Sequence, residues 1–75
     1  MSNYLSEDQI SQMADAALSN YEFSCDWRVA LNAAAEFSMD EFGITPRLSA
    51  CRLAVQHAKV RWQAIVMQTI AEVQS

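Results

Sequence analysis

Apolar residues recur every three or four positions in three segments of the chain, which is the period of an amphipathic α-helix. These segments cover about residues 6–20, 25–42 and 46–73. The chain has one glycine and one proline in 75 residues, and a sheet rich in turns needs more of both. The pattern therefore predicts an all-α, three-helix domain with a long C-terminal helix. We expect residues 1–75 to form this single domain, with residues 1–4 frayed at its start.

The start of the first helix has a specific sequence signature. Ser6 and Gln9 have the spacing of a capping box, and Leu5 and Ile10 that of a hydrophobic staple. The helix is expected to end near Asn20. Its apolar stripe consists of Ile10, Met13, Ala14, Ala17, Leu18 and Tyr21.

Residues 21–24 are expected to connect the first two helices, with Tyr21 and Phe23 packed against the bundle. Ser24 is the predicted N-cap of the second helix, because its hydroxyl can accept a hydrogen bond from the first turn. These assignments place the second helix start at Cys25.

The end of the second helix and the start of the third are marked by turn residues. Gly43 stands where a helix-terminating residue with positive φ is wanted. Thr45 is then expected to cap the third helix, and Pro46 to occupy its first position, where the missing N–H costs no hydrogen bond.

The third helix carries two apolar series on nearly opposite faces. A helix that is apolar on two faces is usually buried on both. The first series, with coiled-coil-like spacing, is Leu48, Cys51, Val55, Ala58, Trp62, Ile65, Thr69 and Val73. The second series, which is the candidate interface, is Leu53, His57, Val60, Ala64, Met67 and Ala71.

This second series has two interpretations. About 28 residues make a helix of roughly 42 Å, and two shorter helices cover one face of it more easily than both. Either the first two helices flank the third on opposite sides, or the second series contacts a second copy or another protein. We favour the latter and expect a homodimer, a complex with another protein, or both.

Charge is unevenly distributed along the chain. The net charge is −4, with eight acids and one base in residues 1–41 and four bases and no acid in residues 42–71. The acidic helices either complement the basic one internally or leave a basic strip for an acidic partner. The candidate polar contact strip is Arg52, Gln56, Lys59 and Gln63.

A helix-turn-helix DNA-binding regulator is the alternative function. Residues 43–45 would form the turn, and Arg47, Ser49, Arg52 and Gln56 would face the DNA. Nucleic acid is nevertheless an unfavourable partner, because the pI of about 4.6 opposes attraction to phosphate. The third helix is also about twice the usual length of a recognition helix.

No residue pattern indicates a catalytic, cofactor or metal site. His57 has no acid or cysteine near it in sequence, and Cys25 and Cys51 belong to no metal-binding spacing. We expect no cofactor and no enzymatic activity. The isolated cysteines are expected to be reduced, which favours a cytoplasmic location, and no apolar run is long enough for a membrane span.

These features together predict a small, acidic, non-enzymatic protein–protein interaction module. Self-association through the long C-terminal helix is expected. Proteins of this size and charge are plausible as bacterial or phage adaptors or inhibitors of larger protein machines.

Overall fold

The computed structural model describes residues 5–74, which form helices and loops and contain no strand. The elements are α1 (Glu7–Ser24), α2 (Trp27–Phe37), the π-helical turn η1 (Ser38–Phe42) and α3 (Leu48–Gln74). The predicted all-α fold with a long C-terminal helix is therefore confirmed. The frayed start predicted for the first four residues lies outside the described part of the chain.

The N-terminus of α1 is fixed by the predicted capping box. The Ser6 hydroxyl accepts a hydrogen bond from the Gln9 N–H at 3.2 Å, and the Gln9 side-chain oxygen accepts one from the Ser6 N–H at 2.8 Å. Both contacts satisfy backbone donors that have no partner inside the helix.

Replacing Ser6 by alanine is expected to lower the free energy of unfolding by about 1 kcal/mol, because it removes a cap hydrogen bond. Urea unfolding followed by circular dichroism at 222 nm measures this change. Ser19→Ala, an exposed position inside α1, is the matched control and should change stability by less than about 0.5 kcal/mol. Equal effects at both positions would contradict the capping role.

The end of α1 differs from the prediction. The helix continues past Asn20 to Ser24 and ends at Cys25, which has a φ of 54° and donates its N–H to the Tyr21 carbonyl at 2.8 Å. A non-glycine residue in this left-handed conformation is uncommon. The residue type at position 25 therefore did not indicate that the helix ends there. Phe23, expected to pack against the bundle, is 91% exposed on this last turn.

The cap of α2 is Asp26 and not Ser24. The Asp26 carboxylate accepts a hydrogen bond from the Arg28 N–H at 2.8 Å, and this bond is the largest influence holding the pKa of the Asp26 carboxyl below its usual value. Ser24 belongs to α1, where its hydroxyl donates to the Asn20 carbonyl at 2.9 Å. Ser24 and Asp26 are both residue types that suit a helix cap, and the extra turn of α1 decides between them.

The predicted stop at Gly43 is confirmed. Gly43 has a φ of 63°, and the N–H of Ile44 donates to the Ser38 carbonyl at 3.3 Å across the end of η1. Ser38 is fully buried, and its hydroxyl donates to the Ile44 carbonyl at 2.9 Å. This buried polar group therefore ties the end of η1 to the following loop.

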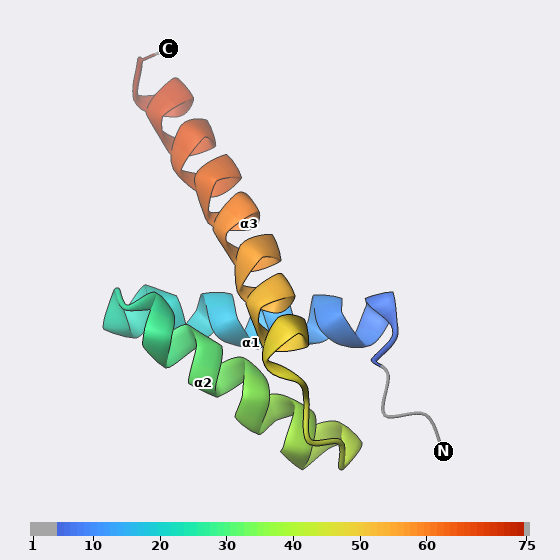
Figure 1. Cartoon of the computed structure of the whole chain (residues 1–75). Helices are drawn as coiled ribbons and strands as arrows, with labels where there is room; N and C mark the ends of the chain where they lie inside the picture. Colours follow the sequence, from blue (N-terminus) through green and yellow to red (C-terminus); the bar gives the residue numbers. More distant parts are fainter. Residues whose placement is uncertain (1–4, 75) are drawn as a thin grey trace.

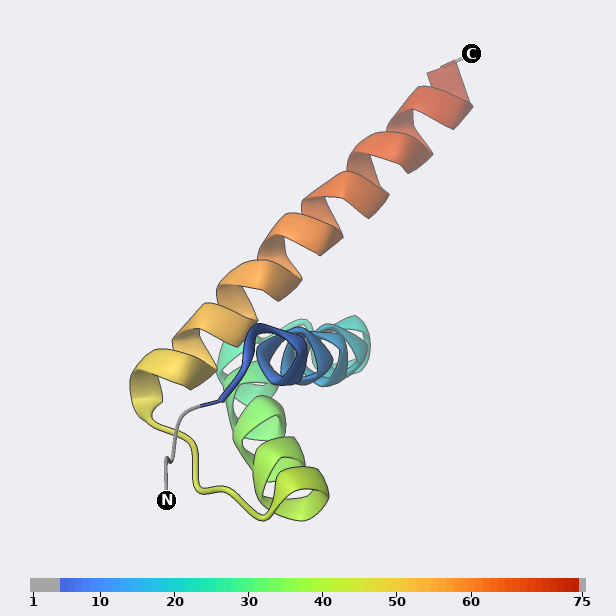
Figure 2. The same cartoon turned by 90° about the vertical axis from the view of Figure 1, so that its right-hand side faces the viewer.

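The predicted start of α3 is wrong by two residues. The helix begins at Leu48, so Thr45 is not its cap and Pro46 is not its first residue. Figure 2 shows these residues in a loop that carries the chain from η1 back to α3. An extended residue covers about 3.3 Å and a helical residue 1.5 Å. An extended loop therefore spans the distance from the end of η1 to the start of α3 with fewer residues than a helix would need.

The three helices form a crossed arrangement. The helices α1 and α2 lie together, and α3 crosses α1 steeply near the middle of α1 (Figure 1). The C-terminal half of α3 then extends away from the other helices in both views (Figures 1 and 2). The molecule is correspondingly elongated, with extents of 52 × 22 × 18 Å.

The core lies where the three helices meet, and it consists mostly of small side chains. Small residues let helix backbones approach closely, and within residues 5–74 Met13 is the only large apolar side chain that is fully buried. The α3 contribution ends at Ala58. The buried hydrophobic residues are Met13, Ala14, Ala17, Ala30, Ala34, Cys51, Ala54, Val55 and Ala58.

Candidate interaction surface

The last part of α3, residues 63–74, projects beyond the core, and we call it the arm. None of its residues is buried. Met67 is 70% exposed and Val73 is 80% exposed, and Ile65 and Ile70 are also exposed. The arm therefore presents apolar side chains to solvent on more than one face.

The predicted second series is exposed along its whole length, but it falls into two parts. Val60 is 61% exposed, and with Ala64, Met67 and Ala71 it forms one stripe that leads out along the arm. Leu53 and His57 lie closer to the core and flank the start of α1. The first two helices do not cover this series.

The sequence did not reveal that the first apolar series is also partly exposed. Cys51, Val55 and Ala58 are buried, whereas Ile65 and Val73 on the same face are exposed. The reason is the crossing geometry, because α1 passes across α3 and does not run alongside it (Figure 1). Burial along α3 consequently stops after about three turns.

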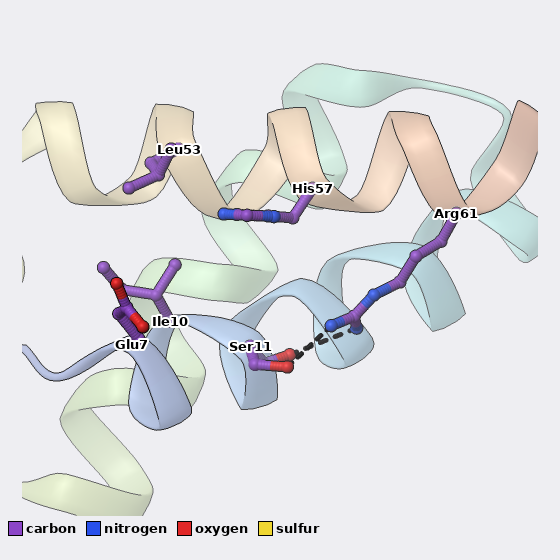
Figure 3. A pocket seen from close by; sticks show the side chains of 6 residues that line it. All are labelled: Glu7, Ile10, Ser11, Leu53, His57 and Arg61. Atoms are coloured by element: carbon purple, nitrogen blue, oxygen red, sulfur yellow. Dashed lines mark hydrogen bonds between the residues drawn. The ribbon is translucent and has the colours of Figure 1, made fainter.

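Leu53 and His57 line a pocket of about 360 Å³ between α3 and the start of α1. Figure 3 shows Glu7 and Ile10 on the α1 side of this pocket and Arg61 at its far end. The fold thus brings an acid into the pocket of His57, which sequence proximity did not show. Glu7 and His57 form no ion pair, and both are exposed, so the pocket contains no acid–base pair.

Arg61 fastens α3 to α1 at the edge of this pocket. Its guanidinium donates to the Ser11 hydroxyl at 2.6 Å and to the Ser11 carbonyl at 3.3 Å, and it pairs with the Asp15 carboxylate. The dashed lines in Figure 3 mark the contacts with Ser11. In this ion pair an acid of α1 neutralises a base of α3, which is the first of the two interpretations of the charge distribution.

An aromatic cluster lies where the arm leaves the core. The rings of Tyr21 and Trp27 are stacked with centroids 3.7 Å apart, and Trp62 meets Tyr21 edge-on at 5.4 Å. The Lys59 ammonium lies 5.6 Å from the centre of the Trp27 ring. Both tryptophans are half-buried, so they form the border of the core and leave part of each ring accessible.

A groove of about 500 Å³ lies between α2 and α3 beside this cluster. Arg52, Gln56 and Lys59 of the predicted polar strip line it. Gln63, the fourth member, lines a separate hollow of about 230 Å³ on the arm, together with Met67 and other residues. The structure therefore joins three of the four predicted strip residues into one site.

Metal and membrane signatures are not found in residues 5–74. No group of three histidine, cysteine, aspartate or glutamate side chains lies close enough there to hold a metal ion. None of the helices is both long and apolar enough to cross a membrane. Cys25 is exposed and Cys51 is buried, both as free thiols, and burial raises the pKa of the Cys51 thiol.

Comparison with known proteins gives no relative for this chain. No family model matches it, and neither a curated protein nor a solved structure is significantly similar. The function is therefore argued from the surface of the molecule itself.

Proposed function

We propose that this chain is a non-enzymatic protein–protein interaction module that self-associates through the long helix α3, along a stripe that includes the arm. The observation that carries the proposal is the exposure of the arm, whose twelve residues contain only one charged side chain, Glu72. An apolar surface of this kind on a small protein is typical of an interaction site.

The distribution of apolar side chains supports this proposal. Six of the nine buried hydrophobic residues among residues 5–74 are alanines, while Val60, Ile65, Met67 and Ile70 are exposed on α3. Burying each of those four side chains contributes roughly 1.5–3 kcal/mol. Because these side chains are exposed in the single chain, their burial can still stabilise a complex.

The lack of packing around the arm points the same way. The arm continues a helix that is already formed in the core, but most helical stability in proteins comes from packing. The arm has no packing partner among the described residues of its own chain. A partner helix would supply that packing and hold the arm helical.

A second copy is the occupant that we propose. Leu53, Val60 and Met67 repeat every seven residues, which is the spacing of a coiled-coil seam. Ala64 and Ala71 lie on the same stripe and permit close approach of two helices. A symmetric pair needs only one self-complementary patch, so the stripe itself meets the requirement for a homodimer.

The cellular setting is part of the proposal. A cytoplasmic location fits the two unpaired thiols, and a small acidic module with no catalytic cluster fits an adaptor or inhibitor of a larger protein machine, of bacterial or phage origin. The acidic net charge of −4 weighs against the alternative helix-turn-helix regulator, because DNA affinity depends largely on cationic contacts with phosphate.

Analytical ultracentrifugation of the wild type and of the double variant Val60→Glu/Met67→Glu tests the proposal. The wild type is expected to sediment as a dimer, and the variant as a monomer whose circular dichroism remains mainly helical. The association constant is expected to fall by about 10-fold or more, because each of the two chains would bury two charges without partners. The matched control is Gln12→Glu/Ser19→Glu, which adds the same charge at exposed positions of α1 and should remain dimeric.

A wild type that stays monomeric at the highest attainable concentration would contradict self-association. If the variant unfolds, the melting temperature of the wild type decides the question. That temperature rises with protein concentration for a dimer and is constant for a monomer.

A further inference from the structure

The groove between α2 and α3 is distinct from the arm stripe and combines two properties. Its floor is apolar, formed by Trp27, Leu31 and Val55. Its rim is cationic, with Arg28 on α2 and Arg52 and Lys59 on α3. We infer that this groove docks an acidic amphipathic helix of another protein.

The charge of the rim is the first argument. Three of the five lysines and arginines of the chain line this groove, although the chain as a whole carries −4. Asp26 pairs with Arg28 at 3.5 Å, and no carboxylate in residues 5–74 pairs with Arg52 or Lys59. Carboxylates of a partner would relieve this concentration of like charge and would favour acidic over basic partners.

The floor of the groove is the second argument. Tyr21 stacks on Trp27 at 3.7 Å with an interplanar angle of 7°, which holds the indole in a fixed orientation. The Trp27 ring is half-buried and the Val55 side chain is nearly buried. A rigid tryptophan bordered by arginines has the composition of a binding hot spot, and little side-chain entropy is lost when a partner covers it.

The shape and chemistry of the groove favour a helix as its occupant. A groove between two helices accepts the apolar face of a third, with anchors at positions i, i+3 or i+4, and i+7. Carboxylates on the two flanks of that helix would reach Arg28 on one side and Arg52 and Lys59 on the other. A nucleic acid offers phosphates to the rim but no aliphatic side chains to Trp27 and Leu31.

The inference does not depend on self-association. Arg52, Val55 and Lys59 lie on a different face of α3 from Leu53, Val60 and Met67, because each residue advances about 100° around the helix. Both surfaces are therefore available at the same time, and either one can be disabled without the other.

The test uses NMR titration of the ¹⁵N-labelled full chain with a synthetic peptide. The peptide is a helix of about 18 residues with leucines on one face and glutamates on both flanks. The largest amide shifts are expected at Arg28, Leu31 and Gln56, together with the Trp27 indole N–H. Replacing the peptide glutamates by glutamines should weaken binding by about 10-fold or more.

The matched variants separate charge at the groove from charge in general. Arg52→Gln/Lys59→Gln should weaken binding by about 10-fold or more, with a melting temperature close to that of the wild type. Gln12→Glu/Ser19→Glu makes the same change in net charge away from the groove and should keep binding within about 2-fold. Val60→Glu/Met67→Glu should bind the peptide as the wild type does, whether or not it dimerises.

Three results would overturn the inference. One is the absence of shifts at millimolar peptide, and another is shifts that lie outside the groove. The third is tighter binding of duplex DNA than of the peptide at about 0.15 M salt, which would assign the groove to nucleic acid.

Discussion

Met13→Ala is expected to lower the free energy of unfolding by about 2–5 kcal/mol, the range for truncating a large buried aliphatic side chain. Met13 has 0% exposure and is the largest fully buried side chain in the part of the chain that the structure describes. Six of the nine buried hydrophobic residues of this core are alanines, whose side chains have no rotamers with which to fill the space that the substitution leaves. Urea unfolding followed by circular dichroism measures the loss.

Met39→Ala is the matched control for this prediction. Met39 lies on η1 and is 45% exposed, so the same substitution there leaves no closed cavity. We expect a change of less than about 1 kcal/mol. A loss of stability at Met39 as large as at Met13 would show that the core does not lie where α1, α2 and α3 meet.

The elements that the sequence predicted best are those with a local physical cause. The capping box of Ser6 and Gln9 involves residues three positions apart, so its geometry follows from the helix itself. Gly43 was recognised because a single glycine at a helix end favours a positive φ. The long apolar pattern of α3 required no tertiary information either.

The boundaries that the sequence missed depend on alternatives that are locally equivalent. Ser24 and Asp26 are both good caps, and Cys25 carries no sign that it adopts the left-handed conformation seen at the end of α1. Pro46 fits a first helical position, yet α3 begins at Leu48. In each case the course of the chain beyond the local motif decides which local option is used.

The candidate sites were predictable only in part, for the same reason. The apolar stripe through Val60 and Met67 follows from the periodicity of α3, but its exposure is known only from the structure, because the first two helices could have covered it. The groove required Trp27 and Arg28 of α2 to lie beside Arg52 and Lys59 of α3. No pattern within either helix predicts that contact, because it depends on how α2 and α3 are placed relative to each other.

The two cysteines provide a second test of which surface is interior. Cys51→Asp is expected to lower the free energy of unfolding by more than about 3 kcal/mol at neutral pH, because a carboxylate would be buried without a partner. Cys51 is 4% exposed and lies among the buried alanines of the core. The pKa of its own thiol is already raised by burial, which shows the same unfavourable environment for a negative charge.

The pH dependence of this variant has a defined sign. Burial raises the pKa of the introduced carboxyl in the folded state above its unfolded value of about 3.9. The folded state then binds more protons than the unfolded state, so the variant loses stability as pH rises from about 4 to 7. Relative to the wild type at each pH, the destabilisation should therefore be smaller near pH 4 than at pH 7.

Cys25→Asp carries the same chemical change at an exposed position and is the matched control. Aspartate tolerates the left-handed conformation of this residue, although a negative charge at the end of α1 opposes the helix dipole by about 0.3–1 kcal/mol. The net change should stay below about 1 kcal/mol. If both variants are equally stable, the first turns of α3 are not packed against α1 and α2. In that case the face of α3 that carries Cys51 would also be available to a partner.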